Sequence, residues 1–125
     1  MTFRSEFDSI AWLRVLADHT EKHNLNHTIS AVAGYYPRIH ISATHCLTDL
    51  TYPVFTQWAN SIDAATVRAM VVDDQIHVTT TGTLGTFTIE IVAVLVGDEA
   101  EQFRASREFP NGTATIHLAG TEAVL

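Results

Sequence analysis

Three histidines stand four residues apart near the start of the chain, at His19, His23 and His27. On a helix, the first two would lie on one face, close enough for both imidazoles to bind one zinc or nickel ion. No glutamate follows His19 as it does in an H-E-x-x-H motif, and a third ligand would have to come from elsewhere. The alternative is that His19 and His23 are half-exposed side chains beside Trp12 with no metal-binding role. We expect no bound metal and no cofactor.

The adjacent residues His45 and Cys46 could form a second reactive pair, in which the imidazole activates a thiolate nucleophile. Neighbouring side chains of an extended segment point to opposite faces, however, so the two groups would not touch. We therefore interpret Cys46 as a small buried apolar residue, and we assign no catalytic residue.

Polar side chains recur at alternate positions in three segments that have the pattern of strands. They are Arg38, His40 and Ser42 in the first segment, His77 and Thr79 in the second, and Thr88 and Glu90 in the third. Side chains two residues apart share a face of a strand, so these groups would project from one surface of a sheet. Arg38, His40, His77 and Glu90 could bind a small ligand there or act as acid and base. The alternative is an ordinary solvated sheet face, on which threonine is common.

Two of these segments belong to a longer pattern between Thr66 and Val96, in which apolar residues occupy every second position and turn residues separate three strands. Such alternation is typical of antiparallel strands with one buried face and one exposed face. We expect Ile89 and Ile91 to lie in the core, and reversals at residues 73–74 and 82–85. The apolar positions are Val67, Ala69, Val71, Ile76, Val78, Phe87, Ile89, Ile91, Ala93 and Leu95.

The rest of the chain predicts two helices and three further strands. Apolar residues at helical spacing predict a helix from about Ser5 to His23, and Thr51 is the expected N-cap of a second helix. Residues 98–109 fit a helix and a strand equally well. We therefore predict one α+β domain, residues 1–125, with an antiparallel sheet of about five or six strands and two helices packed on one face. The further strands are expected over residues 28–33, 37–43 and 114–118.

Val92, Val94 and Val96 stand on the otherwise polar side of the last strand of the meander. A strand that is apolar on both sides is generally buried on both. We expect either the C-terminal segment, with Phe103 and Phe109, or a second subunit to cover these valines. The C-terminal segment is slightly favoured, and a homodimer follows closely.

The 125 residues include 14 Asp and Glu against 7 Lys and Arg, a formal charge of −7. This excess repels the phosphate backbone, so we expect no direct nucleic-acid binding. No apolar run reaches the roughly 20 residues of a membrane helix, the start carries no secretory pattern, and a single cysteine suits the cytoplasm. Motifs for dinucleotides, P-loop phosphates, α/β-hydrolase nucleophiles and zinc ribbons do not occur.

The order of a helix, a strand pair, a tryptophan-bearing helix and a hairpin through Thr81-Gly82-Thr83-Leu84-Gly85-Thr86-Phe87 resembles small, uncharacterised proteins of actinobacteria and their phages. The resemblance covers about residues 39–96, and it implies an intracellular accessory protein that a phage could encode. Because no convincing catalytic or cofactor motif occurs in the sequence, we expect a non-enzymatic, cytoplasmic protein that binds another protein through its acidic surface or its apolar strand end. The alternatives are a small ligand-binding protein or enzyme that uses the face with His40, His77 and Glu90, and an acidic mimic of DNA.

Overall fold

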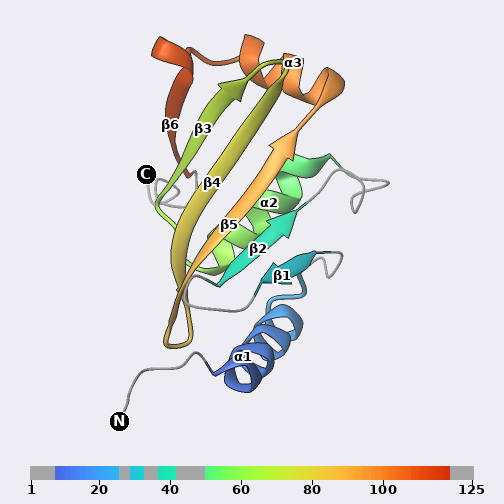
Figure 1. Ribbon diagram of the computed structural model, residues 1–125, viewed down its shortest axis with the longest axis vertical. Coiled ribbons are helices and arrows are strands. Elements are labelled where there is room, and N and C mark those ends of the chain that lie inside the picture. Colours follow the sequence, from blue (N-terminus) through green and yellow to red (C-terminus); the bar gives the residue numbers. More distant parts are fainter. Residues whose placement is uncertain (1–7, 26–28, 33–36, 42–49, 119–125) are drawn as a thin grey trace.

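The computed structural model describes residues 8–25, 29–32, 37–41 and 50–118, which form an α+β structure of three helices, a short 3-10 turn and one six-stranded sheet (Figure 1). The α+β prediction is therefore confirmed. The elements are α1 (Ser9–Lys22), β1 (Ser30–Val32), β2 (Arg38–Ile41), α2 (Thr51–Ser61), β3 (Thr66–Val72), β4 (Gln75–Leu84), β5 (Phe87–Leu95), α3 (Gly97–Ala105), η1 (Pro110–Gly112) and β6 (Thr113–His117).

The strands lie in the order β1-β2-β5-β4-β3-β6, and the pair β2–β5 is parallel while the other pairs are antiparallel. The prediction of a wholly antiparallel sheet is wrong at this pair. The cause is α2, which returns the chain to the end of the sheet where β2 began, so that β3 runs in the direction of β2 (Figure 1). Two reversals later, β5 also runs in that direction. Alternating apolar residues reveal the pleat of a strand but not its direction.

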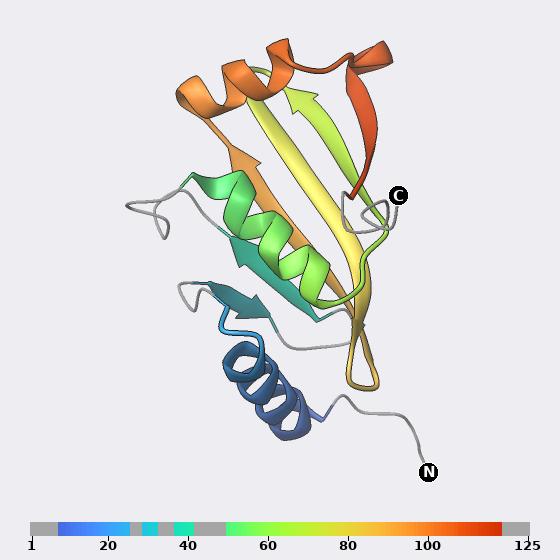
Figure 2. The same cartoon turned by 180° about the vertical axis from the view of Figure 1, so that it is seen from behind.

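One face of the sheet is covered by α2, which lies across it in the view from behind (Figure 2). Trp58 and Phe55 of α2 are fully buried, as are Ile91 of β5 and Val78 of β4, and Ile89 is 1% exposed. Eight of the ten predicted core positions of the meander are buried, and the other two, Val71 and Phe87, are partly buried against the core. We call this side of the sheet the covered face.

Helix α1 packs beside the β4–β5 hairpin, at the end of the covered face (Figures 1 and 2). The ring of the buried Trp12 meets Phe87 edge-on, with the ring centroids 5.5 Å apart. The helix begins at Ser9, because the Asp8 side chain accepts a hydrogen bond from the Ala11 N–H at 3.0 Å and so provides the N-cap. The predicted start at Ser5 lies outside the described residues.

Residues 97–105, inside the segment that fits both a helix and a strand, form the third helix, α3. Phe103 of α3 packs edge-on against Tyr52 of α2, with ring centroids 4.8 Å apart, and also contacts Phe109. These aromatic contacts hold the described C-terminal segment beside α2. The expectation that Phe103 and Phe109 cover the opposite side of the sheet, over the three valines of β5, is therefore wrong.

Glu99 of α3 also corrects the predicted start of α2. Thr51 is the first helical residue, and the N-cap is Leu50, which supplies no capping side chain. Instead, the Glu99 carboxylate accepts hydrogen bonds from the Thr51 N–H at 3.1 Å and the Tyr52 N–H at 2.8 Å. A negative charge at this end also interacts favourably with the helix dipole, so α3 caps α2 across 47 residues of sequence.

Candidate functional site

The side of the sheet opposite α2 carries no helix among the described residues, and it faces the viewer in Figure 1. We call it the open face. The residues that belong to this face follow from the alternation of side chains along each strand and from the register between strands. Its side chains are Ser30, Arg38, His40, Thr66, Arg68, Met70, Val72, Gln75, His77, Thr79, Thr81, Thr83, Thr88, Glu90, Val92, Val94, Thr113, Thr115 and His117.

Arg38 and Glu90 are brought into direct contact on this face. They are register partners on the parallel strands β2 and β5, and the Arg38 Nε atom donates to Glu90 Oε1 at 2.8 Å. Both side chains are partly exposed, so water screens the pair and its contribution to stability is small. The ion pair matters for the charge of the open face, because it neutralises the carboxylate of Glu90, the only one among the described strand residues of that face.

His40 and His77 lie on the same face but do not meet. His40 pairs in register with Val92 of β5, whereas His77 pairs with Val94 and contacts the Gln75 side chain at 3.3 Å. The two histidines are two strand spacings of about 4.8 Å apart across the sheet and two residues apart along β5. Together these offsets separate them by about 12 Å. An acid and base working on one substrate need to be within hydrogen-bond reach of its reacting atoms. His40 and His77 are therefore too far apart to work as an acid–base pair on one substrate.

A shallow pocket of about 230 Å³ lies over the Arg38–Glu90 pair. None of the three histidines of the open face lines it, and its volume is below the several hundred Å³ of typical small-molecule sites. The four residues of the predicted ligand face are thus divided between an ion pair and two separate histidines. The lining residues are Pro37, Arg38, Thr81, Thr88, Ile89 and Glu90.

Apolar side chains gather around His77 instead. Val94 of β5 pairs with His77 on one side and Met70 of β3 pairs with it on the other. Val92 and Val94 are half-buried, while Met70 is 40% exposed and Val96, just beyond the end of β5, is 41% exposed. We call Met70, Val72, Val92, Val94 and Val96 the apolar patch. Three of the five are the valines that the sequence marked as a candidate interface, and Met70 and Val72 extend them across the sheet.

Sequence reasoning missed Met70 and Val72, although the signal was present. Both residues alternate with the buried Val67 and Ala69, so the rule that placed those two residues on the covered face puts Met70 and Val72 on the open face. Only the strand order and the register show that Met70 lies directly across His77 from Val94, because β4 separates β3 from β5.

The predicted histidine pair on α1 makes a structural contact. The rings of His19 and His23 lie 4.4 Å apart, and His19 Nε2 lies 2.9 Å from the Ser61 hydroxyl of α2. That hydroxyl donates its proton to the Trp58 carbonyl at 2.6 Å, so it accepts from His19. Burial, assisted by the nearby His23 and Lys22, lowers the pKa of His19.

No group of three or more His, Cys, Asp or Glu side chains is placed to hold a metal ion within residues 8–25, 29–32, 37–41 and 50–118. His27, Ser42, His45 and Cys46 lie outside these ranges.

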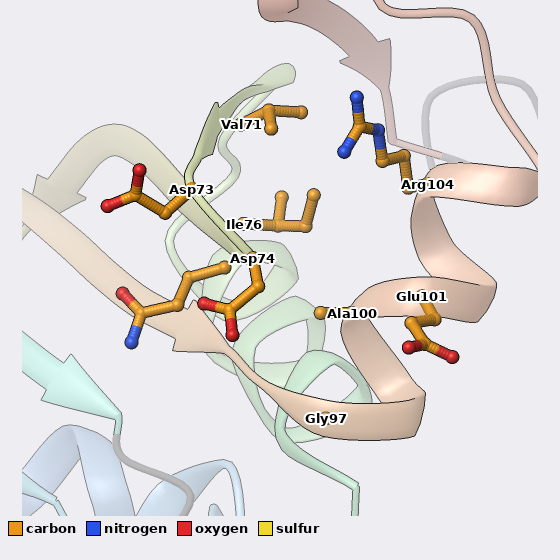
Figure 3. A pocket seen from close by; sticks show the side chains of 9 residues that line it. Val71, Asp73, Asp74, Ile76, Gly97, Ala100, Glu101 and Arg104 are labelled. Carbon is orange, nitrogen blue, oxygen red and sulfur yellow. The ribbon is translucent and has the colours of Figure 1, made fainter.

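A second pocket, which the sequence did not predict, lies between the β3–β4 turn and α3 (Figure 3). Ile76 and Ala100 form apolar parts of its wall, and the Arg104 side chain reaches over it from α3. Its volume of about 270 Å³ is small, and its lining combines three carboxylates with the Arg104 guanidinium but includes no Ser, Thr, Cys, His or Lys side chain. The residues that line it are Val71, Asp73, Asp74, Gln75, Ile76, Gly97, Ala100, Glu101 and Arg104.

Comparison of the chain with protein-family models, curated proteins and solved structures finds no match. Among the described residues, every helix is too short or too polar to cross a membrane.

Proposed function

We propose that this chain is a non-enzymatic accessory protein and that the open face is the surface with which it binds another protein. The observation that carries the proposal is the apolar patch on a sheet face that no described helix covers. Exposed apolar side chains that gather on one face of a protein commonly mark an interaction site, although here His77 of β4 lies between the two halves of the patch. The resemblance to small actinobacterial and phage proteins supports an accessory role in the cytoplasm, with a phage as one source.

The open face offers little support for the alternative of an enzyme or a ligand-binding protein. Its histidines are separated, and the pocket over Arg38 and Glu90 is small and already holds an ion pair. A substrate that used either charged group would first have to break that pair.

The alternative of a DNA mimic loses support from the positions of the carboxylates. Phosphates lie along DNA at regular spacing, so a mimic needs acidic groups in a row on one elongated surface. Here Glu99 caps a helix, Glu90 pairs with arginine, and Asp73 and Asp74 form a turn. These four acidic side chains serve separate local roles and do not form a row on one surface.

The proposal is tested by affinity capture with tagged protein and extract of the native host, supplemented with untagged chain. The baits are the parent, Val94→Lys on the open face, and Ile10→Lys on α1. Ile10 is 58% exposed, so its replacement is a matched apolar-to-lysine change away from the sheet. We expect the parent and Ile10→Lys to retain one protein that Val94→Lys loses. Capture that is equal for all three baits, or no specific capture, would refute the open face as the binding surface.

A further inference from the structure

We infer that the protein bound at the open face is a second copy of this chain, which packs its own open face against the first to form a two-sheet sandwich. The inference rests on the proposed function and adds the identity of the partner. Three properties of the described residues support it: the charge of the face, its chemical symmetry and its area.

The charge of the open face differs from that of the whole chain. Two copies with a formal charge of −7 each repel one another, and contact through acidic regions adds local repulsion. On the open face, Glu90 is the one carboxylate and Arg38 neutralises it, while Arg68 adds a positive charge. Other exposed regions are acidic, such as Asp73 and Asp74 at the β3–β4 turn. The open face is therefore a surface on which two copies can meet without placing unpaired carboxylates together. Arg68 lies on β3, one strand from the edge of the sheet, so its long side chain can extend to water at the rim of such an interface.

The face is also chemically suited to meet a copy of itself. In a two-fold dimer each patch contacts the same patch of the partner, so the patch must be self-complementary. Valine, methionine and threonine side chains satisfy this requirement, because they pack against like side chains in the interior of β-sandwiches. The apolar patch lies on β3, on β5 and at Val96 just beyond the end of β5. Threonine side chains lie around it on the same face.

The area of the face is close to that of a stable interface. Six strands of three to ten residues, at about 3.3 Å per residue and about 4.8 Å between strands, give roughly 600 Å² of flat sheet. Side chains that stand out from the sheet increase the accessible area above that value. A standard interface buries about 800 Å² of each partner. A full face-to-face contact is therefore of the required size.

A groove between α1 and the edge strand β1 is the competing surface for self-association. It has a volume of about 540 Å³, and it is flanked by the exposed Leu13 of α1 and Ala31 of β1. The acidic residue Glu21 also lines it, so pairing two copies there would bring carboxylates together. Ile10, on the exposed side of the same helix, provides the variant that tests this surface.

The deciding experiment is the molar mass in solution, measured by size-exclusion chromatography with light scattering at protein concentrations up to about 100 μM. We expect the parent and Ile10→Lys to have twice the 13.8 kDa mass of one chain. Val94→Lys should have the mass of one chain, because each dimer would bury two lysines without partners. The expected rise in the dissociation constant is at least about 100-fold.

Thermal unfolding of each sample is monitored by circular dichroism. A variant is counted as a monomer only if this measurement shows that it is folded. If Val94→Lys does not fold, Thr79→Lys replaces it, since Thr79 pairs with Val92 on the same face and is half-exposed.

The inference is overturned if the folded parent has the mass of one chain throughout the concentration range. It is also overturned if the open-face variant remains a dimer, or if Ile10→Lys alone becomes a monomer. The proposed function has a separate outcome. A monomeric parent that captures a different protein, in a manner that depends on Val94, would refute the second copy and retain the binding face. A monomeric parent without such capture would refute both.

Discussion

At Gly82 of β4, the sheet lies close to the end of α2. A Cβ atom built on Gly82 would lie 2.7 Å from both the Cδ1 atom and the backbone oxygen of Ile62, which follows α2. The sequence predicted a reversal at residues 82–85, but β4 continues to Leu84 and the reversal occurs at Gly85, where φ is +65°. A glycine in a strand therefore had two explanations, a turn or a close contact, and sequence alone could not separate them.

We predict that Gly82→Ala lowers the free energy of unfolding by about 1–3 kcal/mol. The added methyl group must displace the Ile62 side chain, and it also clashes with the Ile62 backbone oxygen, which moves less easily than a side chain. Urea unfolding followed by tryptophan fluorescence measures the change. The neighbouring exposed residue provides a control, and Thr81→Ala should change stability by less than about 0.5 kcal/mol. Equal stability of Gly82→Ala and the parent would contradict the close contact.

His19 connects α1 to α2 through Ser61, and its lowered pKa makes stability depend on pH. The folded state binds this proton more weakly than the unfolded chain, whose histidine pKa is about 6.5. The stabilisation is therefore complete above about pH 6.5 and declines as the pH falls toward the folded-state pKa. We predict that His19→Gln, which retains an N–H donor for Ser61, reduces this decline. Unfolding curves measured from pH 7.5 down to about pH 5 test it, and parallel curves for parent and variant would contradict it.

At the residue scale, the sequence predicted the membership of each sheet face well. Arg38, His40, His77 and Glu90 do share one face, because alternation along a strand depends only on local geometry. The contact between Arg38 and Glu90 was not predictable, since it requires β2 to lie beside β5 at a particular register. That arrangement depends on α2 and on the two turns of the meander, which lie between β2 and β5 in the sequence.

At the scale of elements, α3 shows how a short helix can organise a longer one. The α3 sequence offers weak helical periodicity, and Phe103 and Phe109 fit a strand equally well. Its helical state is favoured by contacts that sequence does not reveal: Phe103 packs on Tyr52, and Glu99 caps α2. Tertiary contacts of this kind routinely override weak local preference.

We predict that Glu99→Ala lowers the free energy of unfolding by about 1 kcal/mol, because two N–H groups at the start of α2 lose their acceptor. Glu101→Ala is the matched control, since Glu101 is an exposed glutamate on the same helix and should cost less than about 0.5 kcal/mol. Chemical denaturation of the two variants in parallel gives the comparison. If both glutamates have the same effect, the cap does not contribute as described.

At the scale of the whole molecule, one face of the sheet is buried and the other is partly exposed. Ile91 is fully buried beneath α2, and the next residue, Val92, lies half-exposed on the open face. We predict that Ile91→Asp abolishes cooperative unfolding, because a buried unpaired carboxylate costs several kcal/mol against a total stability of about 5–15 kcal/mol. Val92→Asp should unfold cooperatively and lose self-association. Circular dichroism melts of both variants test this, and a normal transition for Ile91→Asp would contradict the covered face.

The most direct test of the account is the rate at which dilute hydrogen peroxide oxidises Met70. This methionine lies in the apolar patch and is 40% exposed in the single chain, so its thioether reports whether the open face is covered. The account predicts that, at a concentration where the parent associates, Met70 is oxidised several-fold more slowly than in Val94→Lys, and that dilution removes the difference. Equal oxidation rates in the two proteins at every concentration would contradict it.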